Sequence, residues 1–399
     1  MKIQGFRGGR VVASFADPAA AWDDGAVAWA EGLIVYVGPA AKAPDAEYTE
    51  CAAGTLVTPG FVDAHTHAAW VGSRHDEFVP KMRGDDYREI AASGGGIKAS
   101  ARAIAAASEE EICTTLAARL RRMAALGVTT VEVKSGYGLE PDQERKQLAA
   151  IAKVAAYTNV PRVVVTFLAL HAVPIAWADR RAEYVTTMAS LVEEVGRNKQ
   201  ASFADAYLDA NAFSIDEGRA VLGAAKGAGL GIRMHIGQFQ DIGGANLAAE
   251  LGASSVEHVE QLDDAGRRAL AEAGVRVVLL PTASFVLNQA PPDVAASRAA
   301  GLRLVVASDA NPGTAPTESL PLALALAVRL YGLTATEVLA GATVEAAASL
   351  GLGDTGSLHV GARADLVLWD LPHEYALLQP WGTSRALRVF RDGQPLIGV

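Results

Sequence analysis

Residues 59–67 are Pro-Gly-Phe-Val-Asp-Ala-His-Thr-His, an apolar segment that runs directly into a His-x-His motif. The stretch from Leu56 to Ala64 has the length and composition of a β-strand buried on both faces. Because alternate residues of a strand point the same way, the imidazoles of His65 and His67 face one side. Two such imidazoles form half of a metal site, and a pair of surface histidines beside a turn is the alternative.

Seven more apolar runs of strand length follow, and alanine-rich helical stretches fall between most of them. The predicted strands are Leu56–Ala64, Thr129–Lys134, Arg162–Leu168, Ala204–Leu208, Gly231–Ile236, Ser254–Val259, Val275–Leu280 and Leu302–Ser308. The predicted helices include Glu109–Leu126, Gln143–Tyr157, Ile215–Ala228 and Asp263–Ala273. Eight strands buried on both faces with helices between them predict an α/β fold, a (β/α)8 TIM barrel. An open doubly wound sheet of similar composition is the alternative.

The two ends of the chain have a different character. Short strands broken by turns occupy the first 57 residues, and a strand over Asp365–Trp369 and a hairpin turn at Asp392-Gly393 occupy the last 45. We expect the two ends to pair in one small discontinuous β-sandwich domain. The predicted domains are therefore residues 1–57 with 355–399, and the barrel over residues 58–354.

Composition narrows the class of protein. Half of the 399 residues are apolar, a fifth are charged, and the formal net charge is −10. This profile excludes a disordered chain and argues against nucleic acid or an anionic membrane as the main partner. Cys51 and Cys113 cannot form a disulfide framework, and no apolar run reaches the length of a membrane helix. We therefore expect a cytoplasmic protein.

Three further polar residues end apolar strands. His171 ends the run from Val165, His235 ends the run from Gly231, and Asp309 ends the run from Leu304. A buried, unpaired imidazole or carboxylate is costly, and a bound metal ion is one way to compensate it. Together with the His-x-His motif they predict a metal site at the C-terminal mouth of the barrel. Imidazole and carboxylate groups bind either zinc or iron, so the sequence does not determine which metal is bound.

Other polar residues lie around the same mouth. Arg74 is in a polar loop, where its guanidinium group could donate two parallel hydrogen bonds to a substrate carboxylate. The alternative is an exposed arginine that only contributes to solubility. Tyr137 lies between two glycines just after a strand, where core packing explains it poorly. His258 ends another strand and is a candidate base or orienting group. The loop over residues 309–316 could bind an anion or the polar edge of a substrate through its backbone N–H groups.

The segment Gly60–His67, the later strand-end histidine and the final strand-end aspartate resemble the amidohydrolase superfamily. Four longer strings resemble, more specifically, the imidazolonepropionase family: Lys134-Ser-Gly-Tyr-Gly-Leu139, Gly94-Gly-Gly-Ile97, His171-Ala-Val-Pro174 and Asp309-Ala-Asn-Pro-Gly-Thr314. The similarity extends from about Leu56 to Asp370.

The resemblance implies a role for each matching residue. One divalent metal ion, zinc or iron, would be held by His65, His67, His235 and Asp309. The substrate or product would be bound by Arg74, Tyr137, His171, Gln238, Asn311, Gly313 and Thr314. The catalytic groups would be His258, Asp309 and Gln238.

The resemblance also implies the reaction. The substrate would be 4-imidazolone-5-propanoate, a small cyclic amide with a carboxylate tail, and hydrolysis would give N-formimidoyl-L-glutamate in the third step of histidine degradation. Asp309 would move the proton of the attacking water to the leaving ring nitrogen, and His258 would help to stabilise the oxyanion. Barrels of this kind often pair, so a homodimer is expected.

Departures from the family pattern leave other functions open. Ile236-Gly237 stands where a small and then an acidic residue are expected, and Asn288 stands where a basic residue is expected. The alternatives are a ring deaminase, a hydrolase of a related heterocycle that bears a carboxylate, and a non-catalytic metal-binding or ligand-binding barrel. A binuclear hydrolase would need a carbamylated lysine, for which Lys134 is the candidate; we favour an ordinary hydrogen-bonded lysine.

Overall fold

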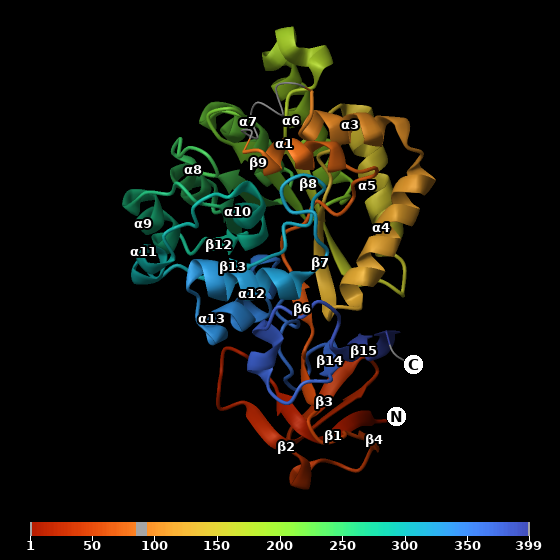
Figure 1. Cartoon of the computed structure of the whole chain (residues 1–399). Helices are drawn as coiled ribbons and strands as arrows, with labels where there is room; N and C mark the ends of the chain where they lie inside the picture. The colour runs from red at the N-terminus through yellow and green to blue at the C-terminus, as the bar shows by residue number, and fades with distance from the viewer. Residues whose placement is uncertain (1, 85–93, 398–399) are drawn as a thin grey trace.

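A computed structural model describes residues 2–84 and 94–397 and places them in two sheets (Figure 1). One is an eight-stranded sheet of sequential parallel strands, in the order β13-β12-β11-β10-β9-β8-β7-β6. Its strands are β6 (Phe61–Asp63), β7 (Val128–Lys134), β8 (Arg162–Leu170), β9 (Phe203–Leu208), β10 (Gly231–Ile236), β11 (Ser255–His258), β12 (Arg276–Leu279) and β13 (Leu304–Val306). The predicted TIM barrel is confirmed.

The first and last strands of this sheet meet just beyond their C-terminal ends. Thr66 and Ala310 form a parallel bridge. The Asp309 amide donates to the His65 carbonyl at 3.1 Å, and the His67 amide donates to the Ala310 carbonyl at 3.0 Å. Because these bonds close the barrel at its mouth, they bring His65, His67 and Asp309 together although the last two are 242 positions apart in the sequence.

The helices follow the strands in the alternation that the sequence predicts. They are α1 (Phe78–Met82), α3 (Ile97–Ala106), α4 (Glu109–Ala124), α5 (Pro141–Ala155), α6 (Arg181–Arg197), α7 (Ile215–Gly227), α8 (Gly244–Leu251), α9 (Asp264–Glu272), α10 (Pro281–Leu287), α11 (Val294–Ala299), α12 (Leu320–Tyr331), α13 (Ala335–Gly341) and α14 (Val344–Ser349). Short 3-10 turns are η1 (Ala40–Lys42), η2 (His75–Glu77), η3 (Ile175–Arg180) and η4 (Glu374–Leu378). Within the described residues, no helix has the length and apolar character that a membrane crossing requires.

The terminal segments form the second sheet, at one end of the barrel (Figure 1). Its strands are β1 (Gln4–Val12), β2 (Ala21–Ala30), β3 (Leu33–Pro39), β4 (Glu47–Glu50), β5 (Leu56–Pro59), β14 (Leu366–Trp369), β15 (Ala386–Arg391) and β16 (Gln394–Ile397). β14 pairs with β5, which joins the two ends of the chain. The predicted pairing of the termini and the hairpin at Asp392-Gly393 are confirmed.

The first predicted barrel strand, Leu56–Ala64, is wrong as a single strand. It breaks at Gly60 into β5, which belongs to the terminal sheet, and β6, which opens the barrel. Pro59 has no N–H to give to a ladder, and a side chain at Gly60 would lie 2.2 Å from Thr129. The terminal sheet therefore extends past the predicted boundary at residue 57, and the division into domains stays a prediction.

Candidate active site

Four of the predicted residues meet at the C-terminal mouth of the barrel. His65 and His67 follow β6, His235 lies on β10, and Asp309 follows β13. The Nε2 atoms of His67 and His235 are 3.3 Å apart. The Asp309 Oδ1 atom is 3.4 Å from His65 Nε2 and 3.6 Å from His67 Nε2. The ligand atoms of the three histidines lie within 4.8 Å of one another, and the Asp309 carboxylate lies beside two of them, as a metal site requires.

The chemistry of these donors fits a divalent metal ion. All four side chains are buried. Within the described part of the chain, neither ring nitrogen of His65 has a hydrogen-bond partner, and neither does Nδ1 of His67. Burial keeps the pKa of both imidazoles well below the usual value, so both are neutral at pH 7. Buried neutral imidazoles without partners are costly unless they coordinate a cation.

Asp309 has a left-handed backbone conformation, which few residues other than glycine adopt but which aspartate tolerates better than most. Its φ is +56°, and Asn311 Nδ2 donates to its backbone carbonyl at 2.7 Å. Burial raises the pKa of the Asp309 carboxyl to about 6. A carboxyl group with a pKa near the working pH is suited to accept and return a proton.

His258 ends β11 and faces the same mouth. Its ring centroid is 5.6 Å from that of His235 and 6.4 Å from that of His65. Burial alone would lower the pKa of His258, but the Glu260 carboxylate, 3.6 Å from Nδ1, outweighs it and the pKa is raised. The charged form of His258 is therefore favoured, and it can donate a hydrogen bond into the cavity.

Tyr137 and His171 stand side by side next to the histidine cluster. Their ring centroids are 5.2 Å apart, and the His171 ring stacks on His67 at 5.3 Å. The Nδ1–H of His171 donates to the Gly136 carbonyl at 2.7 Å. Gly136 has a φ of +108°, a conformation that glycine adopts without strain, and this turn carries Tyr137 into the cavity.

Arg74 lies at the rim, held by a carboxylate of the chain itself. Its Nε and Nη2 atoms donate to the two oxygens of Glu77 at 2.9 and 2.7 Å. The same carboxylate accepts the Gly96 amide at 2.8 Å. A Cβ atom at Gly313 would lie 2.2 Å from Arg74 Nη1, so the guanidinium packs directly on that backbone.

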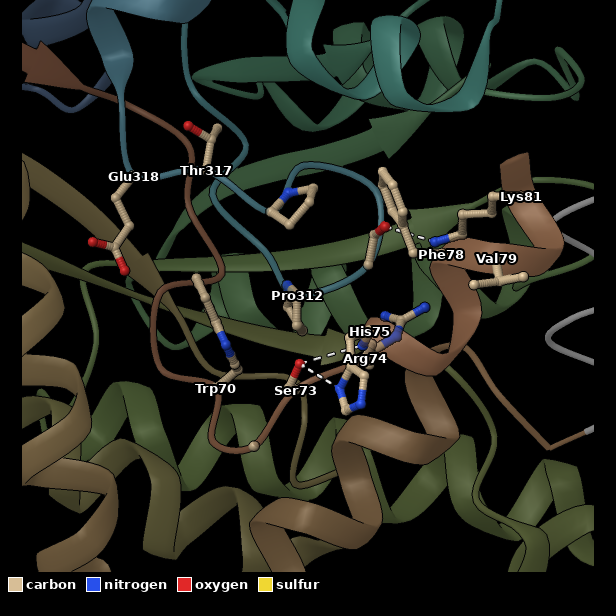
Figure 2. A pocket seen from close by; sticks show the side chains of 13 residues that line it. Trp70, Ser73, Arg74, His75, Phe78, Val79, Lys81, Pro312, Thr317 and Glu318 are labelled. Atoms are coloured by element: carbon tan, nitrogen blue, oxygen red, sulfur yellow. Dashed lines mark hydrogen bonds between the residues drawn. The ribbon is translucent and has the colours of Figure 1, made fainter. Parts of the chain in front are cut away.

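The loop after β13 is folded around Asn311. The Asn311 Oδ1 atom accepts the amides of Gly313 and Thr314 at 2.8 and 2.7 Å. Its side chain therefore organises the loop as well as lining the cavity. Figure 2 shows the outer pocket beside this loop, where Lys81 points toward the loop and donates to the Gly313 carbonyl at 2.7 Å.

A single cavity unites most of the predicted residues. Its lining residues are His67, Arg74, Ile97, Tyr137, His171, Tyr207, His235, Gln238, His258, Asp309, Asn311 and Thr314. His65 lies fully buried beside it, and Gly313 lines the outer pocket of Figure 2. Asn288 ends α10 with a φ of +50°, which asparagine tolerates, and is absent from this lining.

Sequence reasoning missed several residues of the site. Tyr207 lines the cavity and donates to Gln238 Oε1 at 2.9 Å. Asp205 accepts from His235 Nδ1 at 3.0 Å, and Glu77 holds Arg74. Asp205 and Tyr207 alternate on β9, so a charged residue within a predicted apolar strand was the available signal. Glu77 gave no signal, because it lies in a polar loop.

Lys134 is fully buried between two carboxylates. Its Nζ atom is 2.7 Å from Glu132 Oε1 and 2.8 Å from Asp205 Oδ2. Burial alone would lower the pKa of Lys134, but Asp205 and Glu132 outweigh it and the pKa is raised. An ammonium group paired in this way favours the ordinary lysine over a carbamylated one.

Comparison with known proteins gives consistent results. The model of the amidohydrolase family matches residues 56–396. An imidazolonepropionase of Maricaulis maris (strain MCS10) is 42% identical over 358 residues, which cover 89% of either chain. An imidazolonepropionase of Shewanella denitrificans is 38% identical over 395 residues, covering 96% of this chain and 95% of the relative.

Solved structures agree on the fold. A triazine hydrolase variant superposes with a TM-score of 0.75 at 16% identity, covering 100% of this chain and 95% of the other. An adenosine deaminase from Xanthomonas campestris with bound zinc gives a TM-score of 0.70 at 22% identity, covering 98% and 92%. At such identities the likeness concerns the fold alone.

Proposed function

Because the chain belongs to the amidohydrolase family and, within it, to the imidazolonepropionases, we propose that it hydrolyses the ring amide of 4-imidazolone-5-propanoate to N-formimidoyl-L-glutamate. This places it at the third step of histidine degradation. One observation carries the proposal at the level of the site. The same cavity is lined by the histidine–aspartate cluster and by an arginine, a tyrosine and a second histidine suited to a substrate with a carboxylate tail.

We propose that His65, His67, His235 and Asp309 hold one divalent metal ion, zinc or iron. The support is the convergence of their donor atoms and the unpartnered ring nitrogens of His65. A bound ion of this kind supplies a water molecule whose pKa is lowered from about 15.7 toward 7.

The remaining steps fall to side chains of the chain. The Asp309 carboxylate accepts a proton of the attacking water, whose oxygen bonds to the ring carbonyl carbon. His258 donates a hydrogen bond to the carbonyl oxygen as negative charge develops on it. Asp309 then passes its proton to the ring nitrogen as the carbon–nitrogen bond breaks. Water is consumed and nothing else is released, so atoms and charge balance.

The residues that line the cavity determine how the substrate is placed. Arg74 faces the propionate tail, with Tyr137 and His171 beside it. Gln238, fixed by Tyr207, contacts the imidazolone ring. Asn311, Gly313 and Thr314 present the loop that contacts substrate or product. Positioning of this kind can supply several kcal/mol of the barrier, because the reacting groups no longer have to find each other.

We propose a cytoplasmic location for the chain on the evidence of its cysteines. Cys51 and Cys113 are both free, as expected in the reducing cytoplasm. The expected homodimer and the absence of nucleic-acid and membrane partners stay predictions.

The test is to incubate the purified chain with 4-imidazolone-5-propanoate and to follow the loss of its ultraviolet absorbance, with and without a chelator. We expect ring opening with a product heavier by one water, and loss of activity with the chelator. Release of ammonia with the ring intact would instead identify a deaminase. No reaction in metal-loaded protein would contradict the proposed function.

A further inference from the structure

A continuous group of buried charges lies beneath the proposed metal ligands. Glu132 and Lys134 are on β7 and Asp205 is on β9, and all three side chains are fully buried. The Lys134 ammonium contacts both carboxylates. Since β8 separates β7 from β9 in the sheet, this ammonium joins two strands that do not pair with each other.

The other oxygens of these carboxylates contact the ligand segments. Asp205 Oδ1 is 3.0 Å from His235 Nδ1. Glu132 Oε2 accepts the Thr66 amide at 3.1 Å, and Thr66 Oγ1 donates to the Glu132 carbonyl at 2.6 Å. Thr66 is the residue between His65 and His67. A chain of direct contacts therefore runs from His235 through Lys134 to the His-x-His segment.

We propose that Lys134 and Asp205 are positioning residues that hold His235 and the His65–His67 segment in the geometry that binds the metal ion. The proposal rests on the metal site of the proposed function. An aspartate that accepts the Nδ1–H of His235 fixes the ring tautomer and leaves Nε2 as the electron-pair donor. The Lys134 ammonium, 2.8 Å from Asp205 Oδ2, holds this aspartate in place.

The charges of the pair agree with that role. The Lys134 ammonium lies 2.8 Å from Asp205 Oδ2 and 2.7 Å from Glu132 Oε1, and all three side chains are fully buried. Breaking a buried ion pair leaves an uncompensated charge, so each partner constrains the position of the other.

A second metal site explains the same residues less well. Asp205, His235 and Glu257 place ligand atoms within 4.8 Å of one another. Lys134 already pairs with Asp205, and Arg233 Nη2 lies 3.0 Å from Glu257 Oε1. A second cation would have to displace two buried cationic side chains. We therefore infer that Asp205 holds the His235 ring in position and does not bind a second metal ion.

The test compares zinc affinity in folded variants. Lys134→Met keeps the side-chain length without the charge, and Asp205→Asn keeps the shape without it. Competition with a chromophoric chelator measures the zinc dissociation constant, and circular dichroism verifies folding. We expect affinity to fall about 10- to 100-fold in both variants, as for other groups that orient metal-bound histidines. The visible spectrum of the cobalt-substituted chain should change as well.

Asp365→Asn provides the matched control. Asp365 is also a buried aspartate in an ion pair, with Arg162 at 3.1 Å, but it follows the barrel and borders the terminal sheet. This variant should lose stability and keep wild-type zinc affinity and cobalt spectrum. If Lys134→Met does not fold, the zinc affinity and cobalt spectrum of Asp205→Asn alone test the positioning role.

The outcomes separate this proposal from the proposed function. Wild-type zinc affinity and cobalt spectrum in folded Asp205→Asn would overturn the positioning role, whether or not the enzyme opens the imidazolone ring. A wild-type chain that binds zinc but does not open the ring would contradict the proposed function. In that case weaker zinc binding in the two variants would still support the positioning role.

Discussion

The guanidinium of Arg74 rests on the backbone of Gly313 and is fixed from the other side by Glu77. Rigid placement of the guanidinium increases its affinity for a carboxylate, because less conformational freedom is lost when the substrate binds. Glycine is therefore required at position 313 because any side chain would collide with Arg74, and not because the backbone there has an unusual conformation.

Gly313→Ala should displace the guanidinium while leaving the fold intact, since the new methyl group meets the end of the Arg74 side chain and no backbone atom. We expect KM for 4-imidazolone-5-propanoate to rise on the order of tenfold, about 1.4 kcal/mol, with a smaller change in kcat. Steady-state kinetics and thermal melting measure both effects. Gly353→Ala, where a Cβ meets open space, is the control, and an unchanged KM in Gly313→Ala would exclude this contact from substrate binding.

Asp309→Asn should abolish turnover and keep the circular dichroism spectrum of the wild type. The amide nearly preserves the shape but cannot accept the proton of the attacking water. Near-normal turnover in this variant would remove Asp309 from proton transfer.

At this scale, the sequence sufficed for residues that end strands and failed for residues that support them. His65, His235 and Asp309 each interrupt an apolar run, so the period of the strand located them. Glu77 and Tyr207 act through neighbours that only folding supplies. Their roles depend on distances between loops, which no local pattern encodes.

Among the helices, α13 begins with a capping box in which Thr334 and Glu337 bind each other's backbone amides. Glu337 also pairs with the guanidinium of Arg298. The bond from Arg298, together with the cap, lowers the pKa of Glu337 from 4.5 to about 2. The folded state therefore binds this proton less tightly than the unfolded state.

Glu337→Gln should lower the free energy of unfolding on the order of 1 kcal/mol at pH 7. Since the folded pKa is depressed, the contribution is present above about pH 4.5 and is lost as pH falls toward 2. The difference between wild type and variant should therefore shrink over that range in urea titrations. Glu272→Gln, at an exposed carboxylate that ends α9, is the control. A difference that stays constant from pH 7 to pH 3 would contradict the assignment.

The spacing of apolar residues was enough to predict most helices and strands. The strand predicted over Leu56–Ala64 is the exception, and its error has a physical cause. Gly231–Ile236 matches its prediction to the residue, although Arg233 and His235 stand among its apolar residues. The error at Leu56–Ala64 arose because two successive strands in different sheets are both apolar. Only the break at Pro59-Gly60 distinguishes them.

The barrel and the terminal sheet are joined through Trp369. Its ring is 5.5 Å from Phe61, its Nε1 donates to Thr58 Oγ1 at 2.9 Å, and a Cβ at Gly127 would lie 2.2 Å from it. A side chain packed this closely couples the two parts. We therefore expect a substitution at Trp369 to destabilise both parts of the chain.

Trp369→Ala should lower the free energy of unfolding by about 3–5 kcal/mol, because the cavity forms where the two sheets meet. Urea unfolding followed by circular dichroism measures the loss. Trp381→Ala, at a side chain that is 42% exposed, should cost far less. Equal effects of the two substitutions would contradict a joint at Trp369.

For the whole molecule, the alternation of strands and helices was enough to predict the barrel, since sequential parallel strands need helical crossovers. The pairing of the two ends was also predictable in kind. Its register was not, because β5 and β14 lie at opposite ends of the chain and no local pattern encodes their alignment.

Titration of chelator-treated protein with zinc tests the central claim most directly, with bound metal and turnover of 4-imidazolone-5-propanoate measured on the same samples. We predict that turnover is absent without metal, rises in proportion to bound zinc and levels off at one ion per chain. Full turnover in metal-free protein, confirmed by elemental analysis, would contradict a hydrolase built on His65, His67, His235 and Asp309.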